Sequence, residues 1–196
     1  MKQNNISPDT ISYNAVISAV GKCGEWKESL SLLTSMEKSG VQANEITYSA
    51  IVDACYNAGN FADALRIFRQ GLSDYTIPFQ KSKSAIRWDL HKLSLPCACT
   101  MVSLVLLGCG KVKQESSQVP SLIFVTGVGL HSDPRKGPVL KGGVREFLVQ
   151  HSGPSTKEVD SNEGCFQIEG ADLKEWLFSY ELERFGQDMM HPVSSK

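Results

Sequence analysis

Apolar residues in the first eighty positions recur with the period of an α-helix. The apolar stripe comprises Ile11, Ala15 and Ala19 in one stretch and Trp26, Leu30, Leu33 and Met36 in the next. A spacing of three or four residues places such side chains on one face of a helix. Gly24 lies between the two stretches, where the chain must turn. The pattern therefore predicts two helices joined by a short turn.

The same pattern returns 35 residues further along the chain. The stretch "ISYNAVISAVGKCGEWKESL" (11–30) aligns with "ITYSAIVDACYNAGNFADAL" (46–65). Matching positions are Ile11 with Ile46, Tyr13 with Tyr48, Ala15 with Ala50, Ala19 with Ala54, Gly24 with Gly59 and Leu30 with Leu65. Repeats of this length are typical of stacked helical hairpins, each of which buries its apolar face only against its neighbours. The first part of the chain is thus predicted to be a segment of an α-helical solenoid.

Beyond residue 84 the pattern becomes that of a small α/β domain. The stretch "SAIRWDLH" (84–91) has the content of a short strand, a helix is expected from Pro96 to about Leu107, and "SLIFVT" (121–126) predicts a second strand. This order and spacing predict a βαβ unit with parallel strands. A weaker strand and helix follow in "NEGCFQIEGADLKEWL" (162–177). The apolar run from Leu93 to Gly110 is short for a membrane span and contains polar residues, so we expect a buried helix and no span.

Two polar features interrupt the predicted α/β core. Asp89 and His91 lie two residues apart at the end of the first strand, and "TGVG" (126–129) follows the second strand. Because the carboxyl ends of parallel strands share one edge of a sheet, the two features should meet there. An Asp beside a His can orient the imidazole as a general base or recruit a metal ion, and the N–H groups of a glycine turn can hold phosphate charge. The alternatives without chemistry are a hydrogen bond that closes the strand end and a tight turn.

The small net charge of −1 hides an uneven distribution. Residues 1–80 carry 6 Lys/Arg against 8 Asp/Glu, residues 81–151 carry 10 against 4, and residues 152–196 carry 4 against 9. The basic middle part is therefore a candidate surface for a polyanion, although a solvated basic face has the same composition.

The six cysteines form no C-x-x-C pair, so we expect reduced core residues. The spacing of Cys97, Cys99 and Cys109 with His91 fits no zinc pattern.

The stretch "TISYNAVISAVGKCGEWKESLSLLTSMEKSGVQAN" (10–44) resembles a pentatricopeptide repeat in length and pattern. The tetratricopeptide repeat is the main alternative, but its unit is one residue shorter. The resemblance implies that the first helices line a groove for single-stranded RNA, with one base per repeat. It implies that Ile11 and Ile46 flank a base whose edge Asn14 and Asn44 read, favouring a pyrimidine. Ser49 is the matching position of the second repeat, but its partner position falls near Phe79, which is not polar.

The second part of the chain resembles the small MutS-related (Smr) domain. The motifs that carry the resemblance are "WDLH" (88–91) and "TGVGLHSDPRKGPVLKGGVREFL" (126–148). Some Smr domains are nucleases, so the resemblance makes Asp89 and His91 candidate catalytic residues. It makes Thr126, Gly127 and Gly129 candidates for binding the RNA strand. A divalent metal ion is the only cofactor that the resemblance suggests. Val128 and Leu130 depart from the family, which often has basic residues there. The basic residues that compensate in the neighbourhood are Lys92, His131, Arg135, Lys136, Lys141 and Arg145.

The predicted domain layout follows from these two resemblances. It comprises the tail of a preceding repeat (1–9), a repeat (10–44), a second and degenerate repeat (45–79), a linker (80–85), an Smr-like domain (86–183) and a C-terminal tail (184–196). The stretch "ISPD" (6–9) aligns with "VQAN" (41–44), which predicts that the chain begins inside a repeat array and is a fragment. The alternative is a complete protein that uses two repeats as a scaffold.

The combination of the two resemblances implies a plant organellar RNA-binding protein that acts in RNA processing or gene expression. The expected partners are single-stranded RNA and other organelle gene-expression proteins. The chloroplast is the first expectation and the mitochondrion the second, although the sequence shows no transit peptide. Two alternatives stay open: an active endoribonuclease that uses Asp89 and His91, and a protein-interaction scaffold without RNA.

Overall fold

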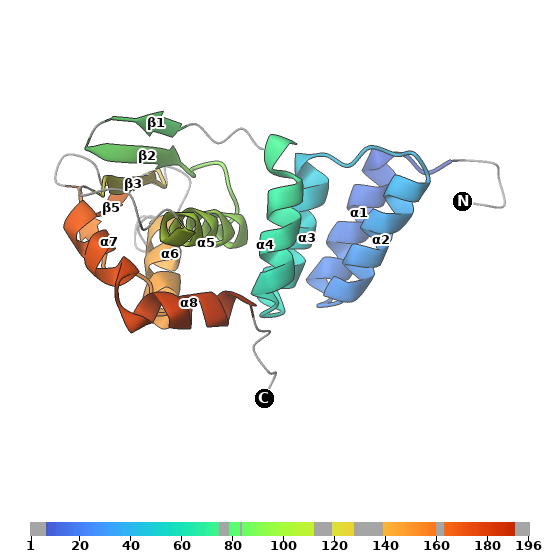
Figure 1. The fold of residues 1–196 in the computed structure, drawn as a ribbon. Helices are drawn as coiled ribbons and strands as arrows, with labels where there is room; N and C mark the ends of the chain where they lie inside the picture. Colours follow the sequence, from blue (N-terminus) through green and yellow to red (C-terminus); the bar gives the residue numbers. More distant parts are fainter. Residues whose placement is uncertain are drawn as a thin grey trace. The chain divides into compact units, whose positions relative to one another are not determined.

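The computed structural model divides the chain into two compact units, with the boundary between Tyr75 and Thr76 (Figure 1). It describes residues 7–74, 79–82, 84–111, 119–127, 139–159 and 163–190. We call the part described by residues 7–74 the repeat unit and the part described by residues 79–190 the sheet unit. Each unit is considered by itself below.

The repeat unit consists of two helical hairpins. Helices α1 (Thr10–Lys22) and α2 (Trp26–Lys38) form the first, and α3 (Glu45–Asn57) and α4 (Phe61–Gln70) form the second. A short 3₁₀ helix, Leu72–Asp74, follows α4. The turn glycines Gly24 and Gly59 have φ of +84° and +70°, a conformation that side chains with a Cβ avoid. The predicted hairpins and their 35-residue repeat are thus confirmed.

The two first helices begin with equivalent polar caps. Asp9 accepts a hydrogen bond from the backbone N–H of Ser12 at 2.8 Å, and Asn44 accepts one from the N–H of Thr47 at 3.2 Å. Each cap satisfies an N–H group that the first helical turn leaves without a partner. The alignment of "ISPD" with "VQAN" therefore has a physical basis, since both stretches end in a helix cap.

The apolar core of the repeat unit lies between α1, α2, α3 and α4. Its fully buried members are Ile17, Met36, Ile51, Val52, Cys55 and Phe68. The apolar stripe that the sequence predicted along the first helices is only partly buried. Ala54 of α3 packs against Gly21 and is buried, whereas the equivalent Ala19 of α1 is exposed. One face of α1 is consequently uncovered by the described residues.

The sheet unit contains five strands in the order β1-β2-β3-β5-β4. The strands are β1 (Phe79–Lys81), β2 (Ala85–Asp89), β3 (Ser121–Val125), β4 (Lys157–Glu158) and β5 (Cys165–Ile168). The parallel pairing of β2 with β3 confirms the predicted βαβ unit, while every other pairing is antiparallel. Strand β1 falls within stretches that the sequence assigned to the second repeat and the linker. Its pairing with β2 places it in the sheet instead.

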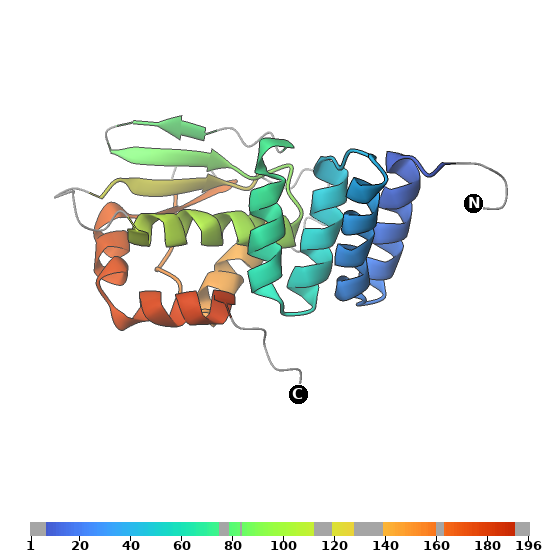
Figure 2. The ribbon, with the colours of Figure 1, turned by 45° about the vertical axis from the view of Figure 1, so that its right-hand side comes forward.

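Four helices accompany the sheet and lie on one side of the strands (Figure 2). They are α5 (Leu95–Lys111), α6 (Val139–Gln150), α7 (Gly170–Leu177) and α8 (Tyr180–Met190). The predicted buried helix is confirmed as α5, which is one residue longer at its start and about one turn longer at its end. The weaker strand and helix are confirmed as β5 and α7. In the part of the chain that the structure describes, no helix is long and apolar enough to span a membrane.

The two faces of strand β3 differ in burial. Leu122 and Phe124 of β3 are 1% and 0% exposed, whereas the alternate residues Ser121, Ile123 and Val125 are only half-buried. Because successive side chains of a strand point to opposite faces, the first set lies under the helices and the second set lies on the other face. Phe166 stacks on Phe124 in the buried layer, with ring centroids 5.2 Å apart.

Candidate nucleic-acid interface

Asp89 and His91 are in direct contact at the end of β2. The Nδ1 atom of His91 lies 2.5 Å from Oδ1 of Asp89, and the same Oδ1 accepts the backbone N–H of His91 at 3.2 Å. The His91 side chain is 44% exposed and the Asp89 side chain is 29% exposed. A carboxylate at Nδ1 favours the tautomer with its proton on that nitrogen, which leaves the lone pair on Nε2. The pair therefore closes the strand end and leaves the imidazole of His91 partly exposed.

The glycine turn lies beside this pair, as the sequence predicted. Asp89 pairs with Val125 in the parallel register, so Thr126 and Gly127 leave β3 at the same edge of the sheet. Gly127 has a φ of +75°, and a Cβ added there would lie 3.4 Å from the Cβ of His91. Gly129, which was also predicted to bind the RNA strand, lies outside the described residues, as do Val128, Leu130, His131, Arg135 and Lys136.

The donors of Thr126 and Gly127 are already occupied. The carbonyl of Gly164 accepts the N–H of Thr126 at 2.8 Å, its hydroxyl at 3.1 Å and the N–H of Gly127 at 3.1 Å. Thr126 is also 6% exposed. In this arrangement these donors fix the turn to the start of β5 and are not directed at a ligand. Phosphate binding by Thr126 and Gly127 stays a prediction.

The basic residues near this edge fall into two groups. Lys141 and Arg145 of α6 both pair with Glu158, and Lys141 also donates to the backbone carbonyl of Glu163 at 2.9 Å. The Lys141 hydrogen bond, followed by the nearby charges, lowers the pKa of Glu158 below its usual 4.5. Lys92 is exposed and has no partner among the described residues. The sequence placed Lys141 and Lys92 together as RNA contacts, but only Lys92 presents an unpaired charge.

Among the described residues, no group of three or more His, Cys, Asp or Glu side chains is placed to hold a metal ion. Of these residues, Asp89 and His91 could supply two ligands to a hard divalent cation, with water or substrate oxygens elsewhere in its shell.

The repeat unit brings Asn14 and Asn44 together, as predicted. The Nδ2 of Asn14 donates to Oδ1 of Asn44 at 3.3 Å, and the hydroxyl of Thr47 donates to Oδ1 of Asn14 at 2.6 Å. Asn44 is also the N-cap of α3, where it forms a reciprocal capping box with Thr47. Its carbonyl oxygen accepts from these donors, and its amide nitrogen has no hydrogen-bond partner among the described residues, although the residue is exposed. The pair therefore combines a structural cap with a free donor.

Two exposed isoleucines lie close to this pair along the chain, one on each first helix. Ile11 of α1 is 78% exposed and Ile46 of α3 is 64% exposed, although both are large and apolar. Ile11 and Asn14 are three residues apart on α1, so they share one helix face. Ser49 lies one turn beyond Ile46 and is half-buried. Residue 79 starts strand β1 and therefore does not precede a third hairpin, whereas Asn44 directly precedes α3.

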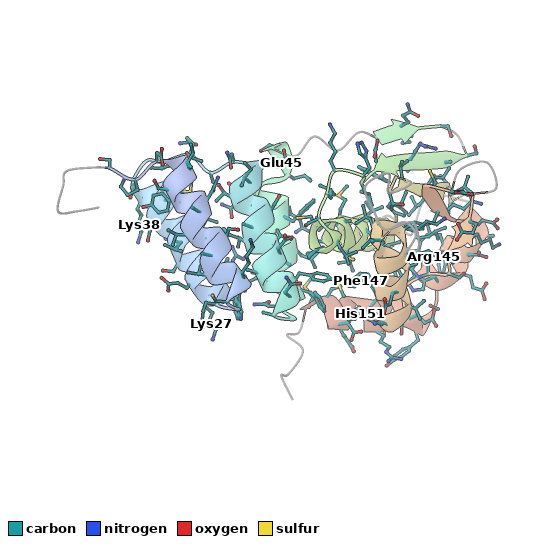
Figure 3. All side chains as sticks on the ribbon, turned by 180° about the vertical axis from the view of Figure 1, so that it is seen from behind. Lys27, Lys38, Glu45, Arg145, Phe147 and His151 are labelled. Atoms are coloured by element: carbon teal, nitrogen blue, oxygen red, sulfur yellow. The ribbon has the colours of Figure 1, made fainter. Side chains whose placement is uncertain are left out.

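A second acid–imidazole pair lies away from this edge and was missed by the sequence. Nδ1 of His151 is 3.2 Å from Oδ2 of Asp188, and the ring of Phe147 lies 4.7 Å from the imidazole (Figure 3). His151 comes just after α6 and Asp188 lies in α8, 37 residues apart along the chain. No local sequence signal links residues so far apart. The pair ties the end of α6 to α8.

Comparison with known proteins identifies the repeat unit. The profile of the PPR repeat family matches residues 8–57, and that of the PPR repeat matches residues 46–74. Residues 8–74 are therefore similar to pentatricopeptide repeats. The predicted choice of this repeat over the tetratricopeptide repeat is therefore confirmed.

Relatives of the repeats occur in Arabidopsis thaliana. The pentatricopeptide repeat-containing protein At1g14470 is 34% identical over 61 residues, which cover 31% of this chain and 11% of that protein. The protein At3g57430, named chloroplastic, is 35% identical over 35% of this chain and 8% of its own length. The protein At1g53600, named mitochondrial, is 33% identical over 36% of this chain and 10% of its own length. The matched region thus spans about a tenth of each of these relatives.

A solved structure is also similar. The crystal structure of the pentatricopeptide repeat protein PPR10 from maize matches over 77% of this chain and 16% of its own, with 16% identity and a TM-score of 0.39. At that TM-score the similarity supports no conclusion about this chain.

Proposed function

We propose that this chain binds single-stranded RNA in organelle RNA processing or gene expression. The repeat unit would select the strand, and the sheet unit, as an Smr-like domain, would hold adjacent RNA. The names of the relatives support an organelle, with the chloroplast as the first choice and the mitochondrion as the second. Other gene-expression proteins of the organelle are the expected protein partners.

The observation that carries the proposal is the composition of the exposed face of α1 and α3. Two aliphatic side chains, Ile11 and Ile46, are exposed close to an amide pair along the chain. Exposed apolar side chains can pack against the flat faces of a base, while an amide donor can bond to its edge. The Nδ2 of Asn44 would donate to a base acceptor, such as the O2 or N3 atom of cytosine.

The proposed contact between Asn44 and a base can be tested by replacing the amide nitrogen of Asn44 with oxygen. Asn44→Asp replaces the amide donor with an acceptor but keeps a side chain that caps α3 equally well. We expect the preference between oligocytidylate and oligouridylate to shift towards uridine, because its ring N–H can donate to the new carboxylate. Fluorescence anisotropy with both labelled RNAs measures the ratio of affinities. An unchanged ratio, with both RNAs bound, would show that Asn44 does not contact a base.

A second candidate function is RNA cleavage at Asp89 and His91. The short Nδ1–Oδ1 contact favours it, because it leaves Nε2 of the partly exposed His91 side chain to accept a proton from a ribose hydroxyl or a water molecule. In this role Asp89 orients the imidazole and stabilises its charged form. The proximity of Gly127 allows the backbone of a substrate to approach His91 closely.

Cleavage is tested with labelled RNA, with and without a divalent metal ion. His91→Ala removes the proposed base and should slow cleavage by roughly 10²–10⁴-fold. Asp89→Asn is the sharper variant, because its Oδ1 can still accept the backbone N–H of His91 while the orienting charge is lost. Equal product formation by the wild type and both variants would attribute the cleavage to a contaminating nuclease and exclude this site.

A further inference from the structure

The face of the sheet opposite the helices carries a row of polar side chains. The register aligns Gln80 of β1 with Arg87 of β2, Arg87 with Ile123 of β3, Ile123 with Gln167 of β5, and Gln167 with Lys157 of β4. Residues paired across strands point to the same face. This row, which we call the sheet row, therefore lies on the face that leaves Ile123 only half-buried.

Arg87 is the unusual member of the sheet row. Its Nη2 donates to Sγ of Cys165, two strands away, at 3.6 Å. A thiol is a weak acceptor and carries no charge to match the guanidinium, which has five N–H donors. Among the described residues, Arg87 makes no ion pair. The other half-buried basic side chains of the described sheet unit, Lys141 and Arg145, are both paired with Glu158.

The position of Arg87 links the sheet row to the Asp89–His91 pair. Arg87 and Asp89 lie two residues apart on β2 and so share one face, with a rise of about 7 Å between them. Asp89, Val125 and Cys165 lie side by side across β2, β3 and β5. Because Arg87 donates to Cys165, its guanidinium extends towards the row of residues that contains Asp89. A partly desolvated guanidinium without a counter-ion is suited to a phosphate, which it can bind through two parallel hydrogen bonds.

We propose that the face of the sheet opposite the described helices is a track for single-stranded RNA, with Arg87 as its phosphate-binding residue. The same RNA would reach the Asp89–His91 pair, because Arg87 and Asp89 share that face of β2. The proposal rests on the proposed RNA-binding function and adds a surface that neither the Asp89–His91 motif nor the glycine turn includes. Since Arg87 would contact the backbone, its contribution should not depend on base sequence.

The test measures binding of labelled oligouridylate to the full chain at several salt concentrations. Arg87→Gln should weaken binding about tenfold and reduce the slope of log affinity against log salt by about 0.7, the value for one contact with a single strand. Arg87→Lys should keep the slope but lose part of the affinity, because an ammonium cannot form the bidentate contact. Arg184→Gln is the charge-matched control. Arg184 is exposed on α8, so affinity and slope should stay at the wild-type values.

A second pair of variants covers the case in which Arg87→Gln fails to fold. Gln80 is exposed and lies opposite Arg87 in the antiparallel register. Gln80→Glu would place a carboxylate beside the guanidinium and should weaken RNA binding several-fold, whereas Gln80→Lys should strengthen it. Wild-type affinity and slope in Arg87→Gln, or equal affinities of the two Gln80 variants, would overturn the proposal. A wild-type chain that binds no RNA even at low salt would instead overturn the proposed function itself.

Discussion

The repeat unit and the sheet unit each present a polar pair at an exposed surface, but they assemble it differently. Asn14 and Asn44 are 30 residues apart and meet only because two hairpins stack. Asp89 and His91 are two residues apart and meet at the end of a single strand. The first pair therefore depends on packing between repeats, while the second depends on the local course of β2. Damage to the packing of one unit should leave the other pair in place.

The largest expected effect is a difference in stability between substitutions on the two faces of β3. Phe124→Ala removes a ring that is 0% exposed and should lower the free energy of unfolding by about 3–5 kcal/mol. Ile123→Ala changes the neighbouring residue on the other face of β3, which is only half-buried, and should cost well under half as much. Urea unfolding of the two variants measures both values. Similar losses would mean that Ile123 is covered as fully as Phe124, which would contradict its place on the proposed RNA track.

The next effect concerns close packing in the repeat unit. A Cβ on Gly71 would lie 2.3 Å from Cγ of Tyr48, so Gly71→Ala should destabilise the repeat unit by about 1–3 kcal/mol. Gly142→Ala in α6 is the matched control, since a Cβ there meets nothing within 4 Å. Its better helix propensity should stabilise the sheet unit by up to about 1 kcal/mol. Thermal unfolding by circular dichroism compares the two, and opposite signs are expected.

A smaller effect tests whether the capping of α3 by Asn44 can be separated from its proposed contact with an RNA base. Asn44→Ala removes the cap of α3 and should cost about 1 kcal/mol of stability. Asn44→Ser can keep the cap but lacks the amide, so we expect near-normal stability with weaker RNA binding. Melting temperature and anisotropy are measured on the same samples. Full RNA affinity in a stable Asn44→Ser variant would limit Asn44 to its structural role.

The smallest effect is a pH dependence that should occur in both units. Hydrogen bonds from Ser12 lower the pKa of Asp9, and Lys141 and Arg145 lower that of Glu158. A carboxyl with a lowered pKa in the folded state stabilises the fold above its unfolded value, near 4, and loses this contribution as pH falls through its folded value. Asp9→Asn and Glu158→Gln should therefore lower the melting temperature slightly at pH 7. Each difference from wild type should shrink towards pH 3, and its persistence there would contradict the assigned cause. Both groups are exposed, so solvent screening keeps the effect small.

Much of the fold could be predicted because its signals are local or periodic. The 35-residue repeat predicted both hairpins, and the strand-like stretches around Asp89 and at 121–126 predicted the parallel pair. Strand β1 was missed because three residues carry too little pattern to identify a strand. Helix α6 was not assigned as an element, although its sequence lies within the Smr-like motif.

The site was predicted less completely, because side-chain pairing depends on tertiary contacts. The sequence brought Asp89, His91 and Gly127 to one edge, but it treated Lys141 as a free cation. The partner of Lys141, Glu158, lies 17 residues away on β4, and no local pattern reveals it. The same holds for Thr126, whose hydroxyl donates to a carbonyl 38 residues further along the chain. Ile11 and Ile46 were expected at the RNA surface only from the resemblance to the repeat family, because apolar residues at helical spacing usually indicate a core.

The most direct test of the central proposal is RNA binding by a variant with the exposed isoleucines changed. Ile11→Glu combined with Ile46→Glu alters two surface positions that lie close to the Asn14–Asn44 pair along the chain, and Val149→Glu makes the same change at an aliphatic residue that is 81% exposed on α6. Titration of labelled pyrimidine-rich RNA at low salt should show strong binding by the wild type and by Val149→Glu, and at least tenfold weaker binding by the double variant. Equal affinity of all three proteins would contradict the assignment of this face to RNA.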